Sequence, residues 1–198
     1  VLITTVEAGG TFGGGNPDTF TPTAASATVD AGTISSTLSA GTDVIILTAS
    51  GAGGAGNITM TTGVTMSGGG SATLTLNAVG SINLSADITA TAGNNLNVVL
   101  LAGSTVTLLN AITTQAGNLT ITANGAVNVP GIMSIGGLTT VTAGALNTVT
   151  FNNNNNFGGA VSIVSGSDVI INDVNGLVLG ASTVANSFNV TATTGDIT

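Results

Sequence analysis

Residues Asn118 to Gly137, NLTITANGAVNVPGIMSIGG, contain the pattern that the rest of the chain repeats. They hold three short runs in which aliphatic residues alternate with small polar ones: Leu119 and Ile121, Val127 and Val129, and Ile132 and Ile135. A period of two is typical of a strand with one buried face. Three such strands within about 20 residues indicate one coil of a parallel β-solenoid.

The runs are separated by corners that contain glycine and proline. Gly125 and the pair Pro130-Gly131 stand between the three runs of this stretch. We predict that they form turns that need a positive φ or a fixed φ, the conformations that glycine and proline supply.

The same three runs recur at intervals of about 20–23 residues. A lone coil buries too little aliphatic surface to offset its lost backbone entropy, so the coils must stack. Parallel crossovers of this kind are nearly always right-handed. We therefore predict an all-β fold, a right-handed parallel β-helix with three short strands per coil. The expected strand positions are Leu74, Leu96, Leu119, Thr139 and Val161 for the first strand, Ile82, Val106, Val127, Val149 and Val169 for the second, and Ile88, Ile112, Ile132, Phe157 and Leu177 for the third.

The chain divides into a short N-terminal segment and the repeats. Residues 1–26 read as a strand, VLITTVEA, followed by a linker from Gly9 to Ser26 with Pro17 and Pro22. The alternation begins at Ala27 and continues through Ile34 and Leu38, so the predicted β-solenoid covers residues 27–198.

Composition excludes several functions. The 198 residues include no Lys, Arg, His or Cys, and the formal net charge is −8. Nucleic-acid phosphates and anionic lipids would therefore find no cationic side chain. Imidazole or thiolate metal sites and Ser-His-Asp or Cys-His catalysis are also excluded. Mean hydropathy is +0.60, but the apolar runs are far shorter than the ~20 residues of a spanning helix. We expect no enzyme, no catalytic, cofactor or metal residues, no nucleic-acid partner and no membrane insertion.

Three local features invite a functional interpretation. The run Asn152 to Asn156 is either a ligand-facing loop or, as we predict, a polar corner whose side chains bond their own backbone. Gly53 to Thr59 resembles a calcium β-roll nonapeptide, but Asn57 stands where the motif needs Asp, so we predict a turn. Asp168 and Asp173 could serve a glycosidase or bind Ca²⁺, although a solvated pair of corner charges is the simpler prediction.

Outward positions carry Thr and Asn in two predicted rows. Such rows can bind ice or a glycan, and they are also what an exposed strand face prefers. One row is Thr75, Asn97, Thr120, Thr140 and Ser162, and the other is Asn83, Thr107, Asn128 and Thr150.

Four longer stretches resemble the coils of filamentous-haemagglutinin-like bacterial exoproteins: Thr33 to Met60, Ser71 to Leu100, Asn110 to Val129 and Val190 to Thr198. These are large, repeat-rich surface proteins, many of them exported by two-partner secretion. The resemblance implies a parallel β-helix, an extracellular location at the bacterial cell surface, and a role in adhesion, matrix or fibre building.

We therefore expect a structural protein, the shaft or subunit of a surface adhesin, fibre or matrix filament. The rival is a glycan- or ice-binding module that uses the outward rows; a glycan-cleaving enzyme is the third candidate. Val1 to Val6 could add itself as a strand to a neighbouring sheet. Residues Asn189 to Thr198 are ordinary coil sequence without a cap, so we expect self-association head-to-tail or continuation into further repeats, as a fragment or a fibre subunit.

Overall fold

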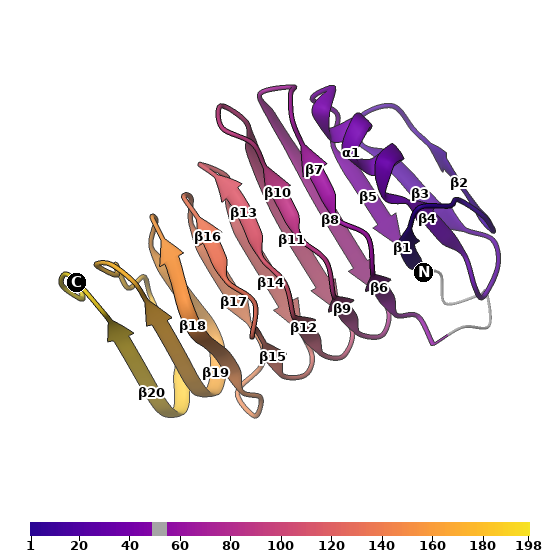
Figure 1. Cartoon of the computed structure of the whole chain (residues 1–198). Helices are drawn as coiled ribbons and strands as arrows, with labels where there is room; N and C mark the ends of the chain where they lie inside the picture. Colours follow the sequence, from indigo (N-terminus) through magenta and orange to yellow (C-terminus); the bar gives the residue numbers. More distant parts are fainter. Residues whose placement is uncertain (49–54) are drawn as a thin grey trace.

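The computed structural model describes residues 1–48 and 55–198, and it is a parallel β-solenoid of about 8 turns. Coil stacks on coil from the N-terminal to the C-terminal end of the molecule (Figure 1). Strands make up 54% of the structure, and a single helix occurs in the described residues. The prediction of a parallel solenoid is confirmed.

Each regular coil contributes one strand to each of three sheets, A, B and C. Strands β18 and β19 turn a corner without a break, so each belongs to two sheets. Sheet A contains, in spatial order, β4 (Thr28–Asp30), β1 (Leu2–Thr4), β6 (Ile58–Met60), β9 (Ile82–Leu84), β12 (Val106–Leu108), β15 (Val127–Asn128), β18 (Val149–Phe157), β19 (Val161–Asp173) and β20 (Val184–Ala192).

The other two sheets complete the cross-section of the solenoid. Sheet B contains β2 (Gly10–Gly13), β3 (Asp18–Pro22), β5 (Val44–Leu47), β8 (Ser71–Ala78), β11 (Asn95–Ala102), β14 (Leu119–Ala123), β17 (Thr139–Thr142) and the first part of β19. Sheet C contains β7 (Val64–Met66), β10 (Ile88–Ala90), β13 (Ile112–Gln115), β16 (Met133–Ile135) and the second part of β18, and helix α1 (Ala31–Ser39) lies beside β7.

The core is a column of aliphatic side chains enclosed by the three sheets. On β11, Leu96, Val98 and Leu100 are fully buried, while the residues between them point outward. Three phenylalanines, Phe20, Phe151 and Phe157, are the largest buried side chains. Alternation with a period of two therefore separates core from surface as the sequence predicts.

The register of β11 differs from the prediction by two residues. Val98, not Leu96, aligns with Leu74 and Leu119, so Leu96 lies opposite Ala72. A slip of two residues leaves every side chain on the same face, whereas a slip of one would bury the wrong set. Alternation alone could not detect this error, because both registers place the same side chains inward along strands that are each eight residues long.

The third strand of the central coil is also shifted. Met133 and Ile135 are buried and Ile132 is 51% exposed, so the predicted inward position of Ile132 is wrong. Met133 aligns with Ile112 of the preceding coil. The turn at Pro130-Gly131 ends one residue later than the pattern indicated, and a shift of one residue exchanges the two faces.

Glycines at these corners serve close approach rather than unusual φ. Neither Gly125 nor Gly131 has a positive φ, so the predicted reason for these glycines is wrong. A Cβ on Gly131 would collide with the backbone of Asn110 in the preceding coil, and one on Gly125 would press on Ser104 and Thr105. The corners need glycine because neighbouring coils touch there.

Strand β1 lies inside its own solenoid, between β4 and β6 of sheet A. Ile3 is fully buried and aligns with Val29 on one side and Met60 on the other. It is an extra strand, because the chain passes from β4 through α1 and β5 before it reaches β6. The strand predicted for this segment is confirmed, and here it completes the sheet of its own chain.

The segment Gly9 to Ser26, predicted as a linker, instead forms a hairpin. Strands β2 and β3 pair antiparallel, and β3 pairs parallel with β5. Phe20 on β3 is fully buried, and its ring contacts Phe12 edge-on with centroids 5.4 Å apart. Two phenylalanines on facing strands supply enough apolar surface to dock a segment that its glycines and prolines marked as a loop.

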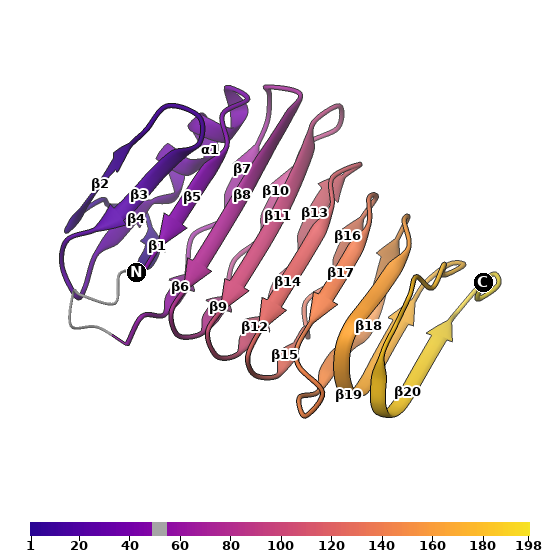
Figure 2. The ribbon, with the colours of Figure 1, turned by 180° about the vertical axis from the view of Figure 1, so that it is seen from behind.

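The two ends of the stack differ, and they lie far apart in both views (Figures 1 and 2). At the N-terminal end, sheet B ends in the antiparallel strand β2, sheet A is bridged by Ala8 opposite Thr28, and α1 lies beside sheet C. At the C-terminal end, β20 pairs with β19, and no other strand of the described chain pairs with it. Its inward Phe188 is 39% exposed, although the aligned Val169 is fully buried.

One core position carries a polar side chain without a partner. Thr139 is fully buried between Leu119 and Val161, and its hydroxyl forms no hydrogen bond in the described structure. We predict that Thr139→Val raises the free energy of unfolding by about 1 kcal/mol, because the isosteric change removes an unsatisfied hydroxyl. Denaturant melts measure the change, with the outward neighbour Thr140→Val as the matched control. A Thr139→Val protein less stable than the wild type would contradict this assignment.

Candidate functional site

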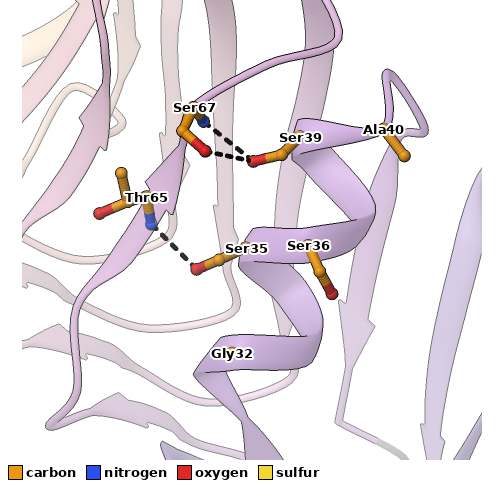
Figure 3. Close-up of a pocket in the computed structure, with 7 residues that line it drawn as sticks. All are labelled: Gly32, Ser35, Ser36, Ser39, Ala40, Thr65 and Ser67. Atoms are coloured by element: carbon orange, nitrogen blue, oxygen red, sulfur yellow. Dashed lines mark hydrogen bonds between the residues drawn. The ribbon is translucent and has the colours of Figure 1, made fainter.

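A shallow depression of about 500 Å³ lies between α1 and β7. It is lined by small residues from both elements, and Figure 3 shows that Ser35 and Ser39 of the helix point toward the strand whereas Ser36 points away from it. Ser35 Oγ accepts a hydrogen bond from the Thr65 amide at 3.0 Å, and Ser39 Oγ accepts one from the Ser67 amide at 2.9 Å. The helix thus satisfies two amides on the edge of sheet C.

Geometry explains why a helix can take the place of a strand here. Residues four apart in a helix are separated by about 6 Å along its axis, and residues two apart in a strand by about 6.6 Å. Ser35 and Ser39 therefore match Thr65 and Ser67, and their hydroxyls act as the carbonyl groups that a neighbouring strand would supply. Ser35 Oγ also donates to the Ala31 carbonyl at 2.7 Å, so its hydroxyl is both a donor and an acceptor.

The helix was not predicted, since the sequence analysis extended the strand alternation through Ile34 and Leu38. The sequence did contain the signals. Asp30 is the N-cap and accepts a hydrogen bond from the Gly32 amide at 3.1 Å, and Gly41 follows the last turn with a φ of 80°. Ile34 and Leu38, four residues apart, are fully buried on one face of the helix. A cap, a glycine after the end and a spacing of four predict a helix.

The two predicted rows of outward Thr and Asn side chains are present, except that one residue in the row on sheet B differs from the prediction. On sheet A, Asn83, Thr107, Asn128 and Thr150 lie opposite one another as predicted. On sheet B, Val99 rather than Asn97 stands between Thr75 and Thr120, because of the shift of two residues in β11. Sheet C carries a row that the sequence analysis missed: Thr65, Thr89, Thr113, Ser134 and Asn156.

Two neighbouring strands of sheet B place four threonines in a rectangle. Thr120 lies opposite Thr140, and Thr122 lies opposite Thr142. All four side chains are half-buried. On β11 the positions next to these threonines are Val99 and Leu101, so the outer surface of sheet B is partly aliphatic.

Amide and carboxylate side chains at the corners join one coil to the next. Asn118 Oδ1, for example, accepts a hydrogen bond from the Leu138 amide of the following coil at 2.7 Å. These bonds satisfy backbone donors where the strands are interrupted. The same arrangement joins Asp43 to Thr73, Asn57 to Ser81, Asp87 to Ala111 and Asn97 to Asn118.

The run Asn152 to Asn156 is a structural corner of this type. Asn155 is fully buried; its Oδ1 accepts from the Met133 amide at 2.9 Å, and its Nδ2 donates to the carbonyls of Asn153 and Asn172 at 2.9 and 3.0 Å. Asn153 donates to the Pro130 carbonyl. The predicted bonding of a side chain to its own backbone is confirmed for Asn155, which donates to the Asn153 carbonyl, whereas the other bonds join neighbouring coils.

Asp168 and Asp173 lie in different environments. Asp168 is half-exposed and accepts from Asn186 Nδ2 and Ser187 Oγ, both at 2.7 Å. These hydrogen bonds, the one from Ser187 foremost, hold the pKa of Asp168 below its ordinary value. Asp173 is fully buried, and burial raises the pKa of its carboxyl. The predicted solvated pair is correct for Asp168 and wrong for Asp173.

The burial of Asp173 has no compensating charge. Its strongest contacts are the amides of Phe157 and Asn175, at the long distances of 3.4 and 3.5 Å. No cationic side chain exists in the sequence to pair with it. Desolvation therefore outweighs the hydrogen bonds.

The remaining candidates lie apart from these groups. Gly53 and Gly54 of the calcium-like motif fall outside the described residues, whereas Gly56 has a φ of 67° and Asn57 is engaged with Ser81. Among the described residues no three acidic side chains come together in a way that could hold a metal ion. In the same part of the chain no helix has the length and apolar character to cross a membrane.

Comparison with known families identifies the repeat. Two segments, residues 93–164 and 166–198, match the family described as "Repeats of unknown function (DUF5649)", and together they cover more than half of the chain. The chain belongs to the DUF5649 family. No curated protein and no solved structure gave a significant match.

The DUF5649 segments cover the C-terminal part of the solenoid, and the regular coils that contain β6 to β10 lie before them. The first begins just before β11 and ends within β19, and the second continues from there through β20. The inserted strand β1, the hairpin and α1 all precede the matched residues. The DUF5649 repeat is thus the coil of three strands, and the closed N-terminal end is built from other sequence.

The serine contacts of α1 can be tested by removing both hydroxyls. Ser35→Ala with Ser39→Ala leaves the Thr65 and Ser67 amides without partners, and we predict a loss of about 1 kcal/mol of stability for each. Thermal melts measure the loss. Ser36→Ala is the matched control, because Ser36 Oγ donates only to the Thr33 carbonyl of its own helix. Equal melting of the double variant and the control would disprove the role of the two hydroxyls.

The two aspartates of β19, Asp168 and Asp173, should affect the pH dependence of stability in opposite ways. A raised pKa means that folding favours the protonated carboxyl of Asp173. The contribution of this side chain to the stability of the fold is therefore complete below its ordinary pKa of 3.8, and it is lost as pH rises through the pKa in the folded state. The lowered pKa of Asp168 stabilises the fold above 3.8, and that contribution is lost as pH falls through the folded value.

The wild type should lose stability as pH rises above 3.8, and we predict that Asp173→Asn does not show this loss. Asp168→Asn, the control on the same strand, should instead remove stability at neutral pH. Chemical denaturation across a pH series gives both curves. Parallel curves for the wild type and Asp173→Asn would show that Asp173 does not titrate as its burial requires.

Proposed function

We propose that this DUF5649 chain is a structural part of an extracellular bacterial surface protein, the shaft or subunit of an adhesin, fibre or matrix filament. The observation that carries the proposal is the continuous stack itself. In every regular coil the inward side chains pack into one continuous core, and the outward side chains on the three sheets form uncharged rows. Such a body has the stiffness and uniform surface of a spacer.

The chemistry of the described residues supports a role without catalysis. The depression beside α1 is shallow; the hydroxyls of Ser35 and Ser39 hold the helix to the strand, and that of Ser36 donates within the helix. Asp168 and Asp173 differ in burial and do not form a carboxylate pair open to a substrate. A base of the Lys, Arg or His type is missing from the whole sequence.

The resemblance to filamentous-haemagglutinin-like exoproteins supports the extracellular location. It rests on the style of the repeats, and the parallel solenoid is the architecture that this resemblance implies. Adhesion, fibre formation and export by two-partner secretion belong to the proposal on that ground.

The open C-terminal face supports assembly through a further coil. Phe188 and Val190 align with the buried Val169 and Ile171 of the preceding coil, yet neither is buried. Another solenoid coil, from further repeats or from a second copy, is the partner that would cover this face. The head-to-tail form of self-association receives less support, because the N-terminal end presents a hairpin and a helix instead of a matching open coil.

A second candidate is a glycan- or ice-binding module. The rectangle of Thr120, Thr122, Thr140 and Thr142 favours it, since regularly spaced hydroxyls on a flat sheet can match a periodic ligand. Thr120→Asp with Thr140→Asp should abolish ice shaping or glycan retention if that function holds, while the fold survives.

The structural proposal is tested on cells that express the native protein. Antibodies raised against the chain should label intact cells, and electron microscopy should show the label along thin rods or filaments. Permeabilised cells are the control for antigen inside the cell. Label that appears only after permeabilisation, or that marks globular particles, would overturn the proposal.

A further inference from the structure

The sequence contains two Asn-Gly pairs, and both lie at corners of the solenoid. Asn124-Gly125 lies between β14 and β15, and Asn175-Gly176 follows β19. An asparagine that precedes glycine can lose its side-chain amide without an enzyme, because glycine has no side chain to obstruct the approach of its backbone nitrogen to the asparagine Cγ atom. Both asparagines are exposed to solvent. Each pair is therefore a candidate for a covalent change that needs only water.

The two pairs differ in how the asparagine side chain is held. Asn175 Nδ2 donates to Asn156 Oδ1 at 3.1 Å, so this side chain is tied to the preceding coil. In the described structure Asn124 forms hydrogen bonds through its backbone alone. Neither glycine N–H is used in a hydrogen bond among the described residues. The Asn124 side chain is thus free to turn its Cγ atom toward the Gly125 nitrogen, whereas that of Asn175 must first break a hydrogen bond.

We infer that Asn124 is a modification site, at which the folded chain converts to aspartate and isoaspartate. The Gly125 nitrogen bonds to Asn124 Cγ, the Cγ–Nδ2 bond breaks, and ammonia leaves with the proton of the Gly125 N–H. Water then opens the resulting succinimide ring at either of its carbonyl carbons. Opening at Cγ gives aspartate. Opening at the backbone carbonyl carbon gives isoaspartate, whose main chain runs through the side chain and is longer by a methylene group.

The isoaspartate product disturbs the contacts that Asn124 makes on both sides. Its backbone N donates to the Ala102 carbonyl of the preceding coil, and its backbone O accepts from Asn147 Nδ2 of the following coil, both at 3.2 Å. In isoaspartate that backbone O belongs to a free carboxylate. The added methylene also lengthens a corner at which even a Cβ on Gly125 would lie 3.2 Å from the Ser104 backbone. Conversion should therefore loosen the stack at this corner.

Ageing of the purified, folded chain tests the site. The protein is kept at mildly alkaline pH in water enriched in heavy oxygen. Peptic peptides are then analysed by mass spectrometry, because the sequence has no Lys or Arg at which trypsin cuts. The peptide that contains Asn124 should lose ammonia and take up a heavy oxygen atom, with isoaspartate among the products.

The second Asn-Gly pair is the internal control. Asn124 should convert at least about fivefold faster than Asn175 in the folded protein, the ratio expected when a hydrogen bond must break first. In denaturant that hydrogen bond is lost, so the two asparagines should convert at similar rates. No conversion at Asn124, equal conversion of both asparagines in the folded protein, or the same rate ratio with and without denaturant would overturn the inference.

Asn124→Gln is the matched variant for the effect on the stack. Glutamine keeps the side-chain amide but closes the larger ring far more slowly, and the exposed Asn124 side chain has no hydrogen bond in the described structure for the change to remove. After the same ageing, thermal melts should show a loss of stability in the wild type and none in Asn124→Gln. Equal melting of the two aged proteins, with Asn124 converted in the wild type, would contradict the assigned effect on the corner. Surface labelling of cells does not depend on this result, so the structural proposal is judged separately.

Discussion

The backbone hydrogen bonds between neighbouring coils are the interaction on which the whole structure depends. They hold successive strands about 4.8 Å apart on all three sheets. At that spacing, corners come into contact, and this is why Gly131 tolerates no side chain and Gly125 has little room for one. The same spacing sets outward residues in register and brings the Asn118 amide group within reach of Leu138 in the following coil.

At each end of such a stack, the backbone groups of the last strand have no neighbouring coil with which to form hydrogen bonds. The N-terminal end does so in three chemically different ways: an antiparallel strand on sheet B, an antiparallel bridge on sheet A, and serine hydroxyls in place of carbonyls on sheet C. The C-terminal end has no comparable device in the described residues. The two ends of the described stack therefore differ in how their backbone groups are satisfied.

The sequence predicts the repeating part of the fold well and the exceptions poorly. Alternation identifies the faces of β8, β11 and β14, because burial repeats with the period of a strand. It cannot fix the alignment of Asn97, since a shift of two residues preserves every face. The helix around Ile34 and Leu38 was missed because its apolar residues also fit an irregular strand, and the hairpin at Phe20 because glycine and proline dominate its neighbours. The burial of Asp173 could not be predicted, because it follows from the corner made by Asn155 and Phe157, residues of the preceding coil.

The insertion of β1 between β4 and β6 joins residues that are far apart in the sequence. Ile3 aligns with Val29 on one side and with Met60, more than fifty residues along the chain, on the other. A contact at that separation costs more loop-closure entropy than a contact between successive coils. We therefore expect the two coils that enclose β1 to form together, whereas each regular coil can add singly to the one before it.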